Sequence, residues 1–152
     1  MRFFKVMKSR NGKMINLNEI KPKINEVCQK FNIILLYLFG SYATGEAYGL
    51  SDLDIGFFPY KKFDLDKVLS LSSKLQDIFE EEAIDLVDLS RAPISLIHRV
   101  IKEGRCLYGK DLRRKIEFEI KNEAFYYDTE PLRKEYFGAL ERRIIDGTFG
   151  YR

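Results

Sequence analysis

The apolar residues follow two different spacings, which predict strands in some segments and helices in others. Residues 33–39 form a continuous apolar run, which predicts a strand buried on both faces of a sheet. Residues 52–58 and 83–89 are predicted as two further strands, and Arg105–Tyr108 as a short edge strand.

Helical spacing fills the segments between these strands. Asn18 is the predicted N-cap of the first helix, with Pro22 in its first turn, and Asp64 that of the second. Pro93 opens a further helix that ends at Gly104. The element order predicts an α/β (α+β) fold, in which a small mixed sheet is flanked by helices.

The two ends of the chain differ from the middle. Residues 1–13 lack clear periodicity and are predicted as an N-terminal arm or extension, with Asn11-Gly12 as a turn signal for a hairpin. Residues 14–109 form the predicted main domain. Residues 110–152 are a predicted helical tail, with helices at about 111–126 and 131–147.

The composition excludes several classes of protein. The chain has 152 residues and 45% hydrophobic residues, so it can bury a core and is not a disordered chain. No apolar run approaches the length of about 20 residues that a bilayer span needs, and we expect a cytoplasmic protein. Cys28 and Cys106 stand far apart beside a single His, which argues against a zinc site and predicts two reduced core thiols.

The charge balance says little about partners. The chain carries 26 basic and 23 acidic residues, and the net charge of +3 is too mixed to mark a nucleic-acid binder. Direct nucleic-acid binding is therefore not expected, and neither is a membrane partner.

The first candidate for chemistry follows the predicted strand over 33–39. Gly40 permits a close approach of a phosphate to the backbone, and Ser41 adds a hydroxyl donor. Residues 41–45 can begin a helix, whose first N–H groups bind phosphate oxygens. Gly-Ser pairs are common in turns, so this pair gains meaning only beside other features.

The second candidate is the acidic pair in Ser51-Asp52-Leu53-Asp54-Ile55. Side chains at i and i+2 of a strand share a face, so Asp52 and Asp54 are expected side by side, about 6–7 Å apart along the strand. Two adjacent carboxylates repel each other, and a cation between them removes that cost. Hard oxygen ligands favour Mg²⁺. The alternative is a solvated polar face on a half-exposed strand.

A third acidic candidate lies in the strand predicted over 83–89. Asp85 and Asp88 have opposite parity, so only one of them faces the same side as the acidic pair. Such a residue completes a set of three carboxylates.

The spacing of these features carries a resemblance to a known family. Gly40-Ser41 is followed by ten residues and then by Asp-x-Asp, and residues 40–57 read GSYATGEAYGLSDLDIGF. This resembles the GSx10DxD signature of polymerase-β-type nucleotidyltransferases, in their minimal (MNT) branch. The third carboxylate of that family lies in a strand of apolar-Asp-Leu-Val pattern, which Asp85 matches and Asp88 does not. The resemblance covers roughly residues 16–109.

The resemblance implies a role for each matching residue. Asp52, Asp54 and Asp85 are the implied catalytic residues and the ligands of two Mg²⁺ ions, with Asp85 as base for the incoming hydroxyl. Gly40 and Ser41 are the implied holders of the triphosphate of ATP, and Ser51 is a further nucleotide-binding candidate.

The same resemblance implies a partner. Minimal enzymes of this type pair with HEPN-domain ribonucleases as antitoxin and toxin, and residues 84–109 and, more loosely, 125–150 are similar to such antitoxins. The implied activity is protein adenylylation, the transfer of AMP from ATP to a tyrosine hydroxyl of a cognate HEPN toxin. Two alternatives stay open: an antitoxin that neutralises by binding only, and a nucleotidyltransferase acting on a small molecule such as an aminoglycoside. The base preference, the number of AMP groups and a homo-oligomeric state also stay open.

The tail and one His-containing pattern complete the candidates. Aromatic and arginine residues interleave in residues 110–152, which predicts a partner-binding surface; the alternative is that these aromatics cover the tail's own core. Arg91 and His98 have the Arg-x6-His spacing of HEPN ribonucleases. The chain lacks the long four-helix pattern of that fold, so His98 is predicted as a helix-surface or packing residue.

Overall fold

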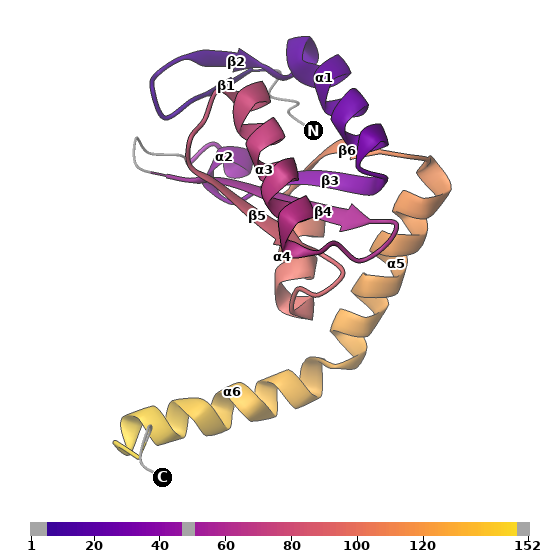
Figure 1. The fold of residues 1–152 in the computed structure, drawn as a ribbon. Helices are drawn as coiled ribbons and strands as arrows, with labels where there is room; N and C mark the ends of the chain where they lie inside the picture. The colour runs from indigo at the N-terminus through magenta and orange to yellow at the C-terminus, as the bar shows by residue number, and fades with distance from the viewer. Residues whose placement is uncertain (1–5, 47–50, 149–152) are drawn as a thin grey trace.

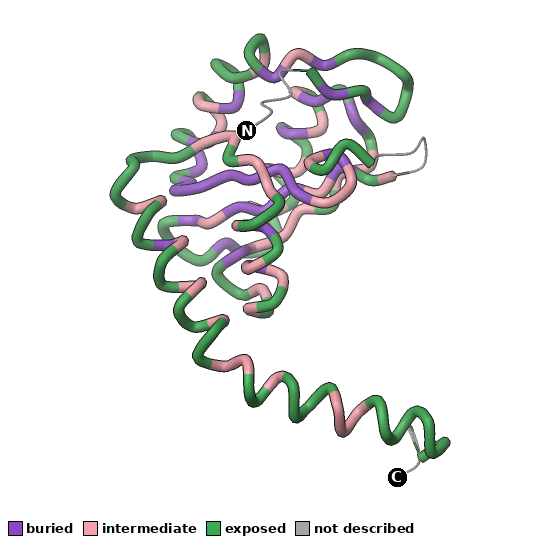
Figure 2. The backbone as a smooth tube through the Cα atoms, turned by 180° about the vertical axis from the view of Figure 1, so that it is seen from behind, coloured by how far each residue is buried: buried purple, intermediate pink, exposed green. Residues whose placement is uncertain are grey.

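The molecule is a small sheet covered by helices, from which one long helix projects. The computed structural model describes residues 6–46 and 51–148. Figure 1 shows the sheet in the middle, helices on both of its faces, and the last helix pointing away from the body. Buried residues concentrate in the sheet and the inner sides of the packed helices (Figure 2). The mixed architecture predicted from the sequence is confirmed.

Four strands form the main sheet in the order β5-β4-β3-β6. The central strands β3 (Ile33–Phe39) and β4 (Leu53–Pro59) are antiparallel. The outer strand β5 (Ile84–Asp88) runs parallel to β4, and the edge strand β6 (Arg105–Gly109) runs antiparallel to β3. Every residue of β3 is buried, as its continuous apolar run predicts.

Helices α1 (Leu17–Lys30) and α3 (Leu65–Phe79) cover one face of the sheet. Their buried side chains recur at helical spacing, and they pack against alternate residues of the central strands. The first core therefore joins side chains from both layers: Ile24, Cys28, Leu71, Leu75 and Phe79 from the helices, and Leu36, Leu38, Leu53, Ile55 and Phe57 from the strands.

Helices α4 (Ile94–Glu103) and α5 (Leu112–Asp128) cover the opposite face. This second core contains Leu35, Tyr37 and Phe39 of β3, Leu89 after β5, and Ile97, Val100 and Phe118 of the two helices. The hydroxyl of Tyr37 donates to Glu119 of α5 at 2.7 Å, which satisfies the polar end of a buried ring.

Several predicted boundaries differ from the structure. Helix α1 is capped by Asn16, whose side chain accepts the Asn18 N–H at 3.0 Å, because Asn16 keeps the extended backbone with which β2 ends. The prediction of Asn18 as the cap was therefore wrong, and Pro22 lies inside the helix. The prediction of Cys106 as a core thiol was also wrong, since it lies exposed on the edge strand.

The segment before α1 folds back as a hairpin. Strands β1 (Val6–Lys8) and β2 (Met14–Asn16) pair antiparallel, with Met7 opposite Ile15. Both of these residues are buried in the first core, so the hairpin is packed onto the body. Of the predicted arm, residues 1–5 lie outside the described residues.

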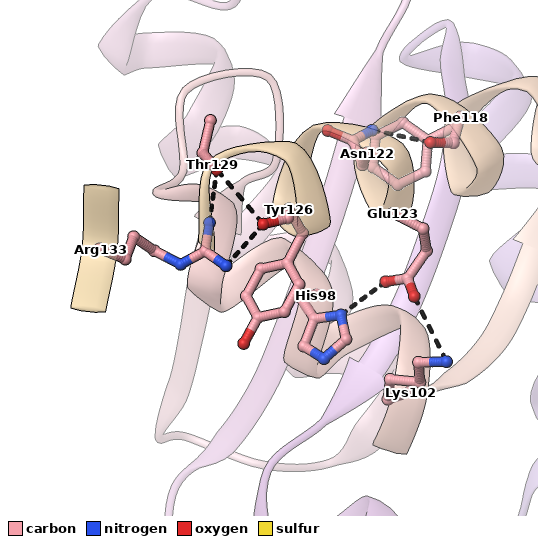
Figure 3. Close-up of polar contacts among 8 residues, drawn as sticks. All are labelled: His98, Lys102, Phe118, Asn122, Glu123, Tyr126, Thr129 and Arg133. Carbon is pink, nitrogen blue, oxygen red and sulfur yellow. Dashed lines mark hydrogen bonds and ion pairs between the residues drawn. The ribbon is translucent and has the colours of Figure 1, made fainter. Parts of the chain in front are cut away.

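The tail bends sharply at Thr129 and continues as α6 (Glu130–Ile145). Arg133 fixes the bend: its guanidinium donates to the Thr129 hydroxyl at 2.5 Å and to the Tyr126 carbonyl at 2.6 Å, and it lies 3.8 Å from the centre of the Tyr126 ring (Figure 3). No residue of α6 is buried.

Among the helices that the structure describes, none is both long and apolar enough to cross a membrane.

Candidate active site

A tight turn follows the central strand β3. Gly40 has φ 70° and ψ −155°, a conformation essentially restricted to glycine, and the single turn α2 (Ser41–Thr44) begins directly after it. The Gly40 carbonyl accepts the N–H groups of Ala43 and Thr44 at 3.1 and 3.3 Å. Ser41 therefore stands at the exit of the strand, as predicted from the sequence.

Asp54 lies directly over this glycine. Phe39 of β3 is the pairing partner of Asp54 of β4, so the carboxylate of Asp54 reaches across the end of β3. A Cβ on Gly40 would overlap Asp54 Oδ2 and lie 3.0 Å from Asp54 Cγ. The absence of a side chain at Gly40 is thus what allows the carboxylate to occupy its position.

Asp85 is the neighbour of Asp54 on the other side. Strands β4 and β5 run parallel with Asp54 paired to Asp85, and paired residues of parallel strands project from the same face. Leu53 and Ile55, which flank Asp54, are buried on the opposite face, as predicted. Asp52 precedes the strand instead of belonging to it, and is exposed.

Burial and the two neighbouring acids make Asp54 costly to ionise. Burial of Asp54 raises the pKa of its carboxyl, and the charges of Asp85 and Asp52 raise it further. The negative charges of Asp85 and Asp52 thus repel ionised Asp54, and a cation bound among the three carboxylates removes this repulsion.

The donor set fits a hard divalent ion such as Mg²⁺, because Asp54 and its neighbours Asp52 and Asp85 offer carboxylate oxygens. Across residues 6–46 and 51–148, no three acidic, His or Cys side chains lie close enough together to hold an ion in their present rotamers. Asp52 and Asp85 are exposed, so rotation of their side chains meets little packing resistance.

Tyr42 ties the glycine turn to the acidic segment. Its ring is buried in the first core, and its hydroxyl donates to the Ser51 carbonyl at 3.3 Å. This bond links α2 to the residue immediately before Asp52. Sequence reasoning missed this role, because a tyrosine in a turn gives no signal of which carbonyl it reaches.

The other acid of β5 has a structural role. Asp88 accepts from the backbone N–H and the hydroxyl of Ser90 at 2.9 and 2.6 Å, and pairs with Arg91 at 3.5 Å. Asp88 therefore caps the turn after β5, in agreement with the choice of Asp85 as the matching carboxylate.

His98 is a packing residue, as predicted. Its ring stacks on Tyr126 with centres 3.7 Å apart, and its Nδ1 lies 2.7 Å from Glu123, which also pairs with Lys102 at 3.3 Å (Figure 3). These contacts attach α5 to α4 and are not shared with the acidic cluster.

A cavity of about 780 Å³ lies at the other end of the sheet, where Ile34 and Phe58 face α5. Its rim carries both charge signs, including the Arg113–Glu117 ion pair at 2.9 Å. None of the predicted site residues lines it.

Comparison with known proteins identifies the family. The sequence profile of the polymerase beta nucleotidyltransferase family matches residues 22–113. The chain is 29% identical to the protein adenylyltransferase MntA of Shewanella oneidensis over 132 residues, which span 87% of this chain and 86% of that protein.

Solved structures of toxin–antitoxin complexes contain the same fold. A toxin–antitoxin structure with AMP-PNP superposes with a TM-score of 0.69 and 27% identity, over 80% of this chain and 98% of that one. An MNT antitoxin in complex with the tri-AMPylated HEPN toxin of Shewanella oneidensis superposes with a TM-score of 0.66 and 24% identity, over 82% and 98% of the two chains, and so supports the fold. The resemblance to MNT antitoxins seen in the sequence is thereby confirmed, and the chain belongs to the polymerase beta nucleotidyltransferase family.

Proposed function

We propose that this nucleotidyltransferase is a Mg²⁺-dependent protein adenylyltransferase that transfers AMP from ATP to a tyrosine hydroxyl of a cognate HEPN ribonuclease toxin, and thereby acts as its antitoxin. The observation that carries the proposal is the placement of Asp54 in register with Asp85 and against Gly40. The names of the relatives support the chemistry of the acceptor, because one is a protein adenylyltransferase and another is bound to an AMPylated HEPN toxin.

Each candidate residue has a task in this reaction. Asp52, Asp54 and Asp85 would hold Mg²⁺, which when bound neutralises charge on the phosphates of ATP. Gly40 and Ser41 would hold the triphosphate, because they form the turn at the end of β3 beside Asp54 and the serine offers a hydroxyl donor. Ser51 would contact the nucleotide from the segment before Asp52.

In the proposed transfer, one bond forms and one bond breaks at the α-phosphorus of ATP. The tyrosine oxygen forms a bond to the α-phosphorus of ATP, while the bond from that phosphorus to the bridging oxygen of the β-phosphate breaks and pyrophosphate leaves. Asp85 accepts the proton of the hydroxyl, which its exposed position on the outer strand allows. The protein thus contributes position and charge, which are the main requirements of phosphoryl-type transfer.

Helix α6 and the bend before it would form the toxin-binding surface. Large apolar side chains of α6 are exposed, among them Leu132 at 68% and Tyr136 at 64%. An isolated helix of this length is marginally stable in water, so a helix that exposes large apolar side chains without a covering layer favours a partner.

A shallow pocket of about 310 Å³ lies at the bend. It is lined by Pro93 and Ile94 of the α4 start, Phe125 of α5, and Tyr136 and Phe137 of α6. Its apolar lining fits an apolar face of the all-helical toxin.

The test is transfer of labelled AMP. The chain is incubated with ATP labelled in its α-phosphate, Mg²⁺ and its cognate HEPN protein. We expect label on a tyrosine of that protein and none after Asp54→Asn, with an unchanged circular dichroism spectrum as the control for folding. Label that persists in the Asp52→Asn/Asp54→Asn double variant would contradict the assignment.

Neutralisation by binding alone is the second candidate, because the exposed apolar surface of α6 favours a stable complex in itself. Ribonuclease activity of the toxin separates the two. Under the adenylylation proposal, the toxin stays inactive after the antitoxin has been removed; under binding alone, activity returns on dissociation.

A further inference from the structure

The tip of the N-terminal hairpin is a rigid turn that presents one arginine. Ser9 and Lys13 close the turn through a backbone hydrogen bond of 2.7 Å, and the Ser9 hydroxyl accepts the Lys13 N–H at 3.0 Å. Gly12 adopts φ 78°, as the reversal of the chain requires. Ser9 is buried, while Arg10 stands exposed at the tip.

A buried carboxylate fixes this tip to the body. Glu81, which follows α3, is only 4% exposed and accepts the backbone N–H of Arg10 at 2.5 Å. A buried charge is costly unless it is hydrogen-bonded, so this contact is a specific attachment of the hairpin. The neighbouring Lys13–Glu80 ion pair holds the same turn from the solvent side.

The attachment point belongs to the edge of the sheet that carries the candidate acids. Two residues after Glu81, the Ala83 carbonyl accepts the N–H of Leu53, which lies between Asp52 and Asp54. Figure 1 shows the hairpin, α2 and the start of β5 at this same end of the sheet. The buried carboxylate of Glu81 therefore holds Arg10 beside the edge of the sheet that carries the candidate acids.

The charge of Arg10 has no fixed partner in the described part of the chain. None of the ion pairs there includes Arg10, although its guanidinium acts on the nearby Tyr42 hydroxyl by lowering the pKa that burial and Glu81 raise. A guanidinium that forms no ion pair among the described residues, carried by a turn fixed at the edge of the candidate acids, matches the anionic phosphates of a nucleotide.

We propose that Arg10 binds the β- and γ-phosphates of ATP, and that the Glu81-anchored hairpin is thereby a working part of the nucleotide site. The inference rests on the proposed function in that ATP is taken as the substrate. It adds a residue far outside the GSx10DxD segment, and it assigns Glu81 as the positioning residue for the hairpin.

The experiment measures nucleotide affinity directly, by isothermal titration of the full chain with ATP and with AMP in the presence of Mg²⁺. Arg10→Gln is expected to weaken ATP binding about tenfold or more, the scale of a charge-assisted contact, and to leave AMP binding within about twofold. Lys8→Gln is the matched control, since it removes the same charge from an exposed position of the same hairpin. It should change neither affinity.

Three results would overturn the role of Arg10. Unchanged ATP affinity of Arg10→Gln, equal losses for ATP and AMP, or the same loss in Lys8→Gln would each overturn the assignment. Thermal unfolding checks that the exposed substitution leaves the fold intact, and Arg10→Lys, which keeps the charge without the fork, should fall between wild type and Arg10→Gln. ATP binding that depends on Arg10 in a chain that transfers no AMP would reject the proposed function and retain this inference, whereas a wild-type chain that binds no ATP would reject both.

Discussion

The contact between Gly40 and Asp54 makes one substitution especially informative. In Gly40→Ala the new methyl group would overlap Asp54 Oδ2 and stand 3.0 and 3.3 Å from the Cγ and Cβ atoms. The carboxylate must then move by about 1 Å or rotate away, and a misplacement of about 1 Å can cost about 100-fold in rate. The backbone at φ 70°, ψ −155° adds strain of about 1–3 kcal/mol for any residue with a side chain.

Gly45→Ala separates these two effects. Gly45 also has a positive φ, of 80°, but a Cβ there meets nothing within 4 Å. Both variants should lose stability in chemical denaturation, whereas only Gly40→Ala should lose AMP transfer by about 100-fold in steady-state assays. Equal activity of the two variants would show that the position of the Asp54 carboxylate does not govern the reaction.

Three further predictions follow from the charges and the exposed surfaces. Asp54→Asn should abolish transfer. It should also raise the unfolding free energy of the metal-free protein by on the order of 1 kcal/mol after solvent screening, because it removes a half-buried charge that Asp85 and Asp52 repel. Lower stability of the variant in urea denaturation would contradict this. Protons compete with Mg²⁺ for Asp54, and the raised pKa of the metal-free carboxyl extends this competition to higher pH, so at subsaturating Mg²⁺ the rate should fall on the acid side at a higher pH than an ordinary aspartate gives. The unfolding free energy of the metal-free protein should gain from Asp54 as the pH falls through the same range. A rate at subsaturating Mg²⁺ that holds down to the ordinary aspartate range would refute this. Tyr136→Ser combined with Phe137→Ser should weaken toxin binding in titration calorimetry by about tenfold or more and leave ATP binding intact, whereas Leu69→Ser, an equally exposed apolar position on α3, should do neither.

The sequence carried most of the information about the sheet, since strand burial follows directly from apolar patterning. The run over 33–39 predicted a strand buried between two helical layers. The opposite parity of Asp85 and Asp88 predicted that only one of them faces Asp54, and the family pattern singled out Asp85, which is the residue paired with Asp54. The spacing between Gly40-Ser41 and Asp-x-Asp is informative because β3 and β4 pair antiparallel, which brings Asp54 back to the end of β3.

What could not be predicted depends on contacts between distant segments. Glu81 is one of three consecutive glutamates, and nothing in that run distinguishes the buried one that accepts from Arg10. The helix start at Asn16 was missed because two asparagines stand near it, and only the preceding strand β2 decides between them. The direction in which α6 leaves the body could not be predicted either, because Arg133 sets the bend through hydrogen bonds to Thr129 and Tyr126.

If the carboxylates around Asp54 direct the transfer of AMP from ATP to a toxin tyrosine, the intact mass of the toxin must increase. The toxin is purified after co-expression with the wild-type chain or with the Asp52→Asn/Asp54→Asn variant. We expect added mass of one or more AMP groups, located on tyrosine by peptide fragmentation, with wild type alone. An unmodified toxin from wild-type co-expression, or an AMP-bearing toxin from the double variant, would contradict it.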